Sequence, residues 1–125
     1  ITLDRPVYTV EPLIFETKNI PVPAKTGLYM LGHPFGLPLV WTPGGKVKEK
    51  LSMVDCFLCN LDAFQGNSGS PVFDRFTHKV VGLLFKGKND LNQGDEFLSL
   101  NLYPLFQSYR EKCQYIHVVI EFLKI

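Results

Sequence analysis

Short apolar segments, separated at regular intervals by glycine and proline turns, constrain the fold of this chain more than any other feature. The ten Phe, ten Gly and nine Pro residues favour an all-β domain over a helical bundle. Six or so strands at this even spacing predict one closed antiparallel barrel. The expected strands are residues 26–31, 39–41, 47–51, 53–61, 71–76, 79–85 and 97–102, with a turn at 42–45 and a hairpin around 77–78.

The apolar periodicity changes near the end of the chain. Ile116, Val119, Ile120 and Leu123 recur at spacings of three and four residues, with Glu121 on the opposite side. This pattern predicts a short C-terminal helix that docks by one apolar face.

Length and charge exclude several classes of protein. The 125 residues, 46% of them hydrophobic, suit one globular domain with a core of its own. The net charge of +1 argues against a nucleic-acid footprint or a polybasic membrane patch. No apolar run is long enough to span a bilayer. Residues 1–6 lack both the features of a signal peptide and an initiator Met, so we expect Ile1 to be a cut end.

The three cysteines cannot all pair within the chain. Cys56 and Cys59 have the spacing of a metal or redox motif, but no second Cys/His pair stands at ligand spacing. Because they lie in a Phe/Leu-rich run, we expect them to pack as small core residues, with no metal and no cofactor. A disulfide from Cys113 to either of the other two is left open.

The chemistry of the chain concentrates in residues 65–71, Gln-Gly-Asn-Ser-Gly-Ser-Pro, which lead into an apolar strand. Gly66 allows a turn that a Cβ would resist, and in that turn the N–H groups of Gly66 and Ser68 can converge on one point. Two such donors would hold the oxyanion that forms when the Ser68 hydroxyl attacks a carbonyl. The alternative is a plain connecting loop, since Gly, Asn, Ser and Pro dominate turns for conformational reasons alone.

The longer run Gly-Asn-Ser-Gly-Ser-Pro-Val-Phe at 66–73 resembles the nucleophile loop of the chymotrypsin-like (trypsin-like) serine peptidases. It is most similar to the bacterial branch that includes the staphylococcal glutamyl endopeptidase. Residues 80–87 match the strand that follows the serine hairpin in that family, and the resemblance covers residues 1 to about 90. It implies a six-stranded Greek-key barrel with Ser68 as the nucleophile and the N–H groups of Gly66 and Ser68 as the oxyanion hole.

That family is built from two barrels with the active site between them. By the resemblance, residues 26–125 form the second barrel with its C-terminal helix. Residues 1–25 would then be the end of a first-barrel strand and the connector between the barrels. The resemblance also implies a protein or peptide substrate, and we expect a secreted or periplasmic location. The charge and the lack of a spanning apolar run argue against a nucleic acid or a membrane as partner.

The triad histidine and aspartate of the family both precede the serine. None of His33, His78 and His117 matches the triad base, and Asp4 matches a structural aspartate downstream of the triad member. The chain alone is therefore expected to be inactive, and its partner would be an N-terminal half that carries both residues. If so, an exposed apolar patch should lie near Ser68 wherever that partner is absent.

The resemblance also indicates residues for specificity. Asp62, six residues before Ser68, matches the floor of the primary specificity pocket and would favour Arg or Lys before the scissile bond. It could equally be a loop residue that binds nearby backbone. Leu84 and Phe85 stand where Glu-cleaving relatives have a histidine, which argues against an acidic preference. The strand from Leu84 through Lys86 to Gly87 should pair with the substrate backbone, with Lys86 repelling basic side chains.

Two other functions remain open from the sequence. The first is a non-catalytic relative that binds extended peptides along the edge from Leu84 to Gly87. The second is a secreted β-barrel unrelated to proteolysis, in which replacing Ser68 would change nothing.

Overall fold

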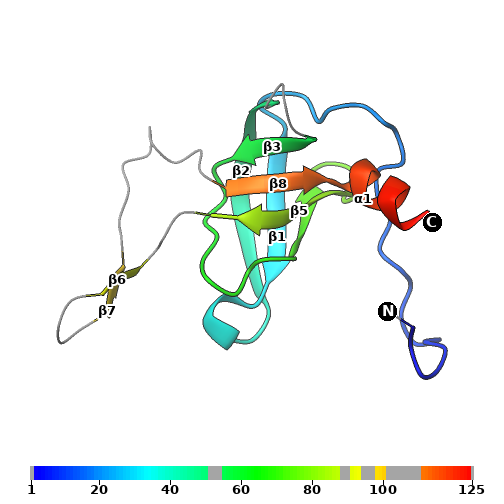
Figure 1. The fold of residues 1–125 in the computed structure, drawn as a ribbon, viewed down its shortest axis with the longest axis horizontal. Helices are drawn as coiled ribbons and strands as arrows, with labels where there is room; N and C mark the ends of the chain where they lie inside the picture. Colours follow the sequence, from blue (N-terminus) through cyan, green and yellow to red (C-terminus); the bar gives the residue numbers. More distant parts are fainter. Residues whose placement is uncertain (1, 51–54, 88–90, 94–97, 101–110, 125) are drawn as a thin grey trace.

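Six antiparallel strands close into a single barrel in the computed structural model of the chain, which describes residues 2–50, 55–87, 91–93, 98–100 and 111–124 (Figure 1). Around the barrel the strand order is β1-β2-β3-β8-β5-β4. The strands are β1 (Gly27–Gly32), β2 (Val40–Lys50), β3 (Cys56–Cys59), β4 (Pro71–Asp74), β5 (Val80–Lys86) and β8 (Glu111–Tyr115). The six-stranded antiparallel barrel expected from the sequence is confirmed.

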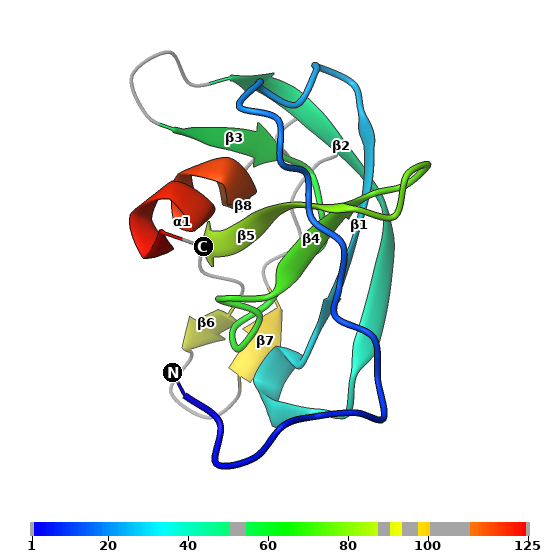
Figure 2. The same ribbon diagram turned by 90° about the vertical axis from the view of Figure 1, so that its right-hand side faces the viewer.

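Three short elements and one helix complete the described part of the chain. They are the 3₁₀ turn η1 (Pro34–Gly36), the paired strands β6 (Leu91–Gln93) and β7 (Leu98–Leu100), and the helix α1 (Ile116–Leu123). The helix contacts β5 and β8, as Figure 2 shows, so the predicted C-terminal helix is also confirmed. Across the described ranges, no helix has the length and apolar character needed to cross a membrane.

The barrel interior is filled by alternate side chains of its strands, because neighbouring residues of a strand face opposite sides. In β1, Leu28 and Met30 are fully buried, and in β8, Cys113 and Tyr115 are buried. The rings of Phe57 and Tyr115 pack in the centre with their centroids 5.1 Å apart. The buried hydrophobic cluster consists of Leu28, Met30, Val47, Phe57, Cys59, Leu61, Ala63, Val72, Val81, Leu84, Cys113 and Tyr115.

We expect Phe57→Ala to destabilise the fold by about 3–5 kcal/mol, because it empties the space of a large ring at the centre of the barrel. Phe57 is 0% exposed, whereas Phe122 on α1 is 84% exposed. Phe122→Ala is therefore the matched control and should change stability by less than about 0.5 kcal/mol. Denaturant unfolding of the two variants measures the difference. Equal stabilities would mean that Phe57 is not a core residue.

All three cysteines are buried free thiols, which confirms their role as core residues. The Cys59 and Cys113 sulfurs share a hydrogen bond at 3.7 Å. That hydrogen bond, together with burial, holds the pKa of the Cys113 thiol well above its usual range. Burial also raises the pKa of Cys56. Since the reactive form of cysteine is the thiolate, a raised pKa makes the thiols of Cys56 and Cys113 poor nucleophiles.

The structure differs from three of the elements expected from the sequence. The prediction of a turn at 42–45 is wrong, because β2 runs unbroken through Pro43 and Gly44. The register between β2 and β1 shifts at this point, as in a β-bulge. Of the strand expected at 97–102, the structure describes residues 98–100, which form β7 and pair with β6, while β8 closes the barrel between β3 and β5. The sequence did not predict β8 (Glu111–Tyr115), because only Cys113 and Tyr115 of its five residues are apolar. Of the strand expected at 53–61, β3 covers 56–59, and residues 53 and 54 lie outside the described ranges.

The segment before β1 is joined to the barrel by backbone hydrogen bonds, at Lys25, whose N–H donates to Val47 O at 2.7 Å, and near Phe15. Ile14 and Glu16 exchange backbone hydrogen bonds with Val80 at 2.9 Å each, next to a parallel bridge between Phe15 and Val80. Lys79 adds an ion pair with Glu16 at 3.5 Å. The interpretation of residues 1–25 as the end of a first-barrel strand and a connector stays a prediction.

Candidate active site

Ser68 lies on an exposed loop whose backbone is anchored on both sides. The N–H of Asn67 donates to Phe64 O at 3.0 Å, and the N–H of Ser70 donates to Asn67 O at 3.0 Å. The loop is joined to β5 by Gly69 N–H to Leu84 O at 2.7 Å. Ser68 itself is exposed, while Asn67 and Ser70 on either side are buried. The serine hydroxyl is therefore presented to solvent by a fixed backbone.

The N–H groups of this loop alternate between paired and unpaired. Those of Asn67, Gly69 and Ser70 donate to backbone carbonyls. Within the described part of the chain, those of Gly66 and Ser68 donate to no protein atom. An N–H without a protein acceptor is available to a ligand or to water. These two N–H groups are the pair that the sequence assigned to the oxyanion hole.

Gly66 is in the left-handed region, at φ +99°, and it sits against the turn that contains η1. A Cβ at this position would lie 2.8 Å from His33 O and 2.9 Å from Phe35 N. The two segments are also joined by a hydrogen bond from Phe35 N–H to Gln65 O at 2.7 Å. Both the backbone conformation and the close approach therefore require glycine.

A second glycine, Gly32 at the end of β1, lets the Ser68 loop pack closely against that strand. A Cβ on Gly32 would collide with Asn67 Oδ1 and Ser70 Oγ, so the missing side chain makes room for both polar groups. Both Asn67 and Ser70 are almost completely buried at this contact. The tight Gly-Asn-Ser-Gly-Ser loop thus depends on the end of a strand far away in sequence.

A groove of about 460 Å³ opens beside Ser68. Apolar side chains supply most of its walls, among them Leu13, Leu31, Leu39 and Phe73. Leu13 and Leu39 are 59% and 60% exposed. The exposed apolar surface expected near Ser68 is present, built from the segment before β1, from β1 and from the turn that follows β1.

Among the described residues, His33 is the one histidine that lines this groove. Its Nδ1 donates a hydrogen bond to Leu37 O at 3.0 Å, since a carbonyl oxygen only accepts. His78 instead binds the Tyr29 hydroxyl at 3.1 Å, and His117 stacks on Tyr115. Within the described residues no histidine hydrogen-bonds Ser68, so this part of the chain supplies no assembled triad base.

The other residues singled out in the sequence lie apart from the groove. Asp62 is exposed on the loop after β3. On the β4 side, β5 is paired only as far as Leu83, and the Leu84 N–H then binds Ser70 O at 3.0 Å. Phe85, Lys86 and Gly87 continue as an exposed segment. Sequence reasoning did not foresee the groove walls or the buried Glu111, whose carboxylate contacts Gly87, because both depend on strand packing.

The family model of the S46 peptidases, described as Peptidase S46, matches residues 24–96, which is more than half of the chain. The chain belongs to the peptidase S46 family. The match includes the Ser68 loop and β5, and it does not single out the glutamyl-endopeptidase branch. No curated protein sequence matches the chain.

Among solved structures, this S46 family member is similar to the Rv3671c protease of M. tuberculosis. The active form matches with a TM-score of 0.67 and 19% identity, covering 93% of this chain and 48% of that one. An inactive form matches with a TM-score of 0.62 and 19% identity, covering 94% and 56%. At these identities the similarity establishes the fold, and the chain spans about half the length of the solved proteases. Family and fold together identify a domain related to the serine proteases.

Proposed function

We propose that this chain is the nucleophile-bearing half of a serine endopeptidase, with Ser68 as the nucleophile. The observation that carries the proposal is an exposed hydroxyl at the edge of an apolar groove, flanked by the N–H groups of Gly66 and Ser68, which have no acceptor among the described residues. The trypsin-like mode of action belongs to this proposal, as does the requirement for a triad histidine and aspartate from an N-terminal half.

In the proposed reaction, Ser68 Oγ forms a bond to the carbonyl carbon of the scissile peptide while its proton passes to the triad histidine. The carbonyl oxygen becomes an oxyanion that accepts hydrogen bonds from the N–H groups of Gly66 and Ser68. The C–N bond then breaks, and the leaving amine takes the proton from the histidine. Water then attacks the carbonyl carbon of the acyl-enzyme while the triad histidine takes a proton from it. The bond to Ser68 Oγ breaks, and the histidine returns the proton to Oγ.

The exposed end of β5 offers a place where the substrate residues before the scissile bond can pair with the barrel as an added strand. Beyond Leu84, whose backbone binds Ser70 and Gly69, the β4 side of β5 is unpaired in the described structure, so Phe85 to Gly87 offer an edge for an antiparallel substrate strand. Exposed Lys86 stands on this segment and would disfavour substrates with basic side chains nearby.

The test is a fluorophosphonate probe, which reacts with serine hydrolases, followed by an intact-mass spectrum with trypsin as a positive control. We expect an adduct on Ser68 when the upstream half is present and none on the chain alone. An upstream half that assembles with the chain and yet leaves Ser68 unlabelled would contradict the proposed reaction. Internally quenched peptides with blocked termini then distinguish endopeptidase activity from the removal of terminal residues.

A second candidate function is a non-catalytic relative that binds extended peptides along the edge from Leu84 to Gly87. The observation that favours it is that no described histidine hydrogen-bonds Ser68. An upstream sequence without His and Asp at the triad positions, together with peptide binding that survives Ser68→Ala, would support this candidate over the enzyme.

We expect Asp62→Asn to lower kcat/KM for substrates with Arg before the scissile bond by about fivefold or less. Asp62 is exposed, and ion pairs at exposed sites contribute at most about 1 kcal/mol. The same substrates with Leu at that position are the control and should be cleaved equally well by both forms. A loss well above tenfold would mean that the bound substrate desolvates Asp62 as the floor of a specificity pocket.

A further inference from the structure

Two lysines face each other at the exposed end of β5. The register between β5 and β8 pairs Leu84 with Cys113. The next pair is Lys86 with Lys112, so the register shifts at Phe85, as in a β-bulge. In a regular ladder Phe85 would stand opposite Lys112, and Lys86 would point to the other face of the sheet. The irregularity in β5 therefore brings two cationic side chains together.

Both lysines lie on the outer face of the barrel. Lys112 is half-buried between Glu111 and Cys113, which are buried and face the interior. Lys86 is exposed and, because it stands directly opposite Lys112, shares its face. The carboxylate of Glu111 belongs to the other face of β8, where it contacts Gly87.

The described part of the chain gives these lysines no counter-ion. Within it, neither Lys86 nor Lys112 forms an ion pair or a side-chain hydrogen bond. Like charges directly opposite each other on two strands destabilise a sheet. A carboxylate bound between the two ammonium groups would remove this repulsion, so charge complementarity favours an acidic ligand at this place.

The lysine pair lies beside the path proposed for the substrate. Leu84 N–H donates to Ser70 O at 3.0 Å, and Gly69 N–H donates to Leu84 O at 2.7 Å, so the nucleophile loop occupies the backbone of Leu84. Phe85 is the first residue of β5 beyond that contact. An antiparallel substrate strand runs opposite to β5, so its residue before the scissile bond lies opposite Phe85. The second residue before the scissile bond then lies opposite Lys86.

We infer that Lys86 and Lys112 form a subsite for an acidic side chain, Asp or Glu, at the second residue before the scissile bond. This side chain points to the face of Lys86, because opposite residues of a strand pair share a face. Its carboxylate accepts hydrogen bonds from both ammonium groups. The inference rests on the proposed function, because it takes the added strand to be the substrate of Ser68.

The test uses the complete protease and internally quenched peptides that differ only at the second residue before the scissile bond, which is Asp, Asn or Lys. Asn is the neutral match of Asp, so the ratio of the two kcat/KM values isolates the charge. We expect a ratio of about 5 to 30, since each exposed ion pair contributes up to about fivefold. The ratio should fall towards unity in about 0.5 M NaCl, because salt screens exposed charges.

Substitutions of the two lysines should change this preference in a graded way. Lys112→Ala should lower the Asp-to-Asn ratio to an intermediate value, because one ammonium group remains. Lys86→Ala should lower it further, since Lys86 lies directly opposite the substrate residue. Lys86→Glu should reverse the preference, so that the Lys peptide is cleaved best. Circular dichroism checks that all three variants fold.

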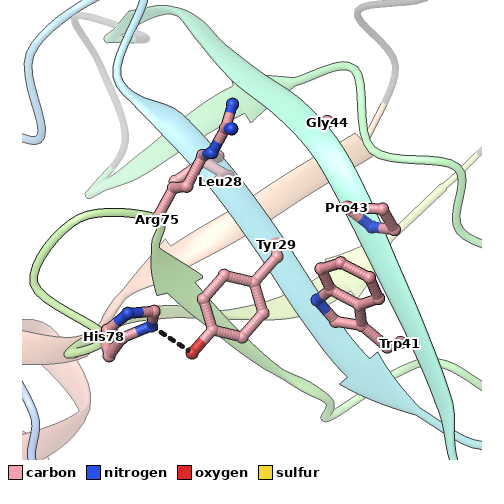
Figure 3. Close-up of a pocket in the computed structure, with 7 residues that line it drawn as sticks. All are labelled: Leu28, Tyr29, Trp41, Pro43, Gly44, Arg75 and His78. Atoms are coloured by element: carbon pink, nitrogen blue, oxygen red, sulfur yellow. Dashed lines mark hydrogen bonds between the residues drawn. The ribbon is translucent and has the colours of Figure 1, made fainter.

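Arg75→Glu is the matched control. Arg75 is an exposed cation on the hairpin before β5, in a separate hollow of about 540 Å³ beside Tyr29 and Trp41 (Figure 3). It lies at the opposite end of β5 from Lys86, and its reversal changes the net charge by the same amount as Lys86→Glu. The Asp-to-Asn ratio should stay that of the unchanged protein.

Three results would overturn the inference. They are equal cleavage of the Asp and Asn peptides, a preference for Asp that Lys86→Glu leaves unchanged, and a preference that Arg75→Glu reverses to the same extent, which would indicate a general effect of net charge. Each of these results leaves the proposed function intact, because the peptides are still cleaved.

Failure of the proposed function has a different signature, in which no peptide is cleaved and no fluorophosphonate adduct forms on Ser68. Fluorescence anisotropy of the same peptides, labelled with a fluorophore, then measures binding alone. Tighter binding of the Asp peptide that is lost in Lys86→Glu would support the acidic subsite on a binding domain. Equal binding of the Asp and Asn peptides would overturn it.

Discussion

Ser68→Ala is expected to abolish hydrolysis by the complete protease, with kcat falling by a factor on the order of 10⁶, as when the nucleophile of a serine peptidase is removed. The physical reason is that no acyl-enzyme can form without the hydroxyl, so only binding and the oxyanion donors remain. Turnover of a fluorogenic peptide measures the loss, and the fluorophosphonate adduct should disappear with it.

The control for this variant is Thr77→Ala, which removes an exposed hydroxyl from the hairpin between β4 and β5. Its activity and labelling should match those of the unchanged protein. Turnover that persists in Ser68→Ala would rule out Ser68 as the nucleophile and would favour the binding domain as the function of this barrel.

Gly66→Ala is expected to lower kcat by about 10² to 10³ and to destabilise the fold by roughly 1–3 kcal/mol. An alanine here must hold φ near +99°, and its Cβ would lie 2.8 Å from His33 O. The loop must therefore move, which withdraws the N–H of residue 66 from the oxyanion. Denaturant unfolding and peptide turnover measure the two effects separately.

Gly44→Ala provides the matched control. Gly44 also has a positive φ, +85°, but a Cβ on it would meet no atom within 4 Å. This variant should show a similar backbone strain and leave turnover unchanged, because it lies on β2, away from the Ser68 groove. If the Gly66 and Gly44 variants turned over substrate equally, the N–H of residue 66 would have no role in catalysis.

The sequence alone determined the fold class and the position of the reactive loop. Alternating and continuous apolar runs between Gly and Pro turns are local patterns, and they correctly predicted β1, the hairpin of β4 and β5, and α1. The left-handed conformation of Gly66 also follows from a local rule, since a residue without a Cβ adopts it at little cost. Such features depend on residues that are close together in the chain.

The tertiary structure alone decided what surrounds Ser68. Gly32 makes room for Asn67, the η1 turn supports Gly66, and Leu84 binds both Gly69 and Ser70, although each pair is distant in sequence. The closing strand β8 and the groove beside Ser68 likewise arise from segments that meet only when the barrel closes. Contacts of this kind depend on register and packing between distant segments, and no periodicity within one segment encodes them.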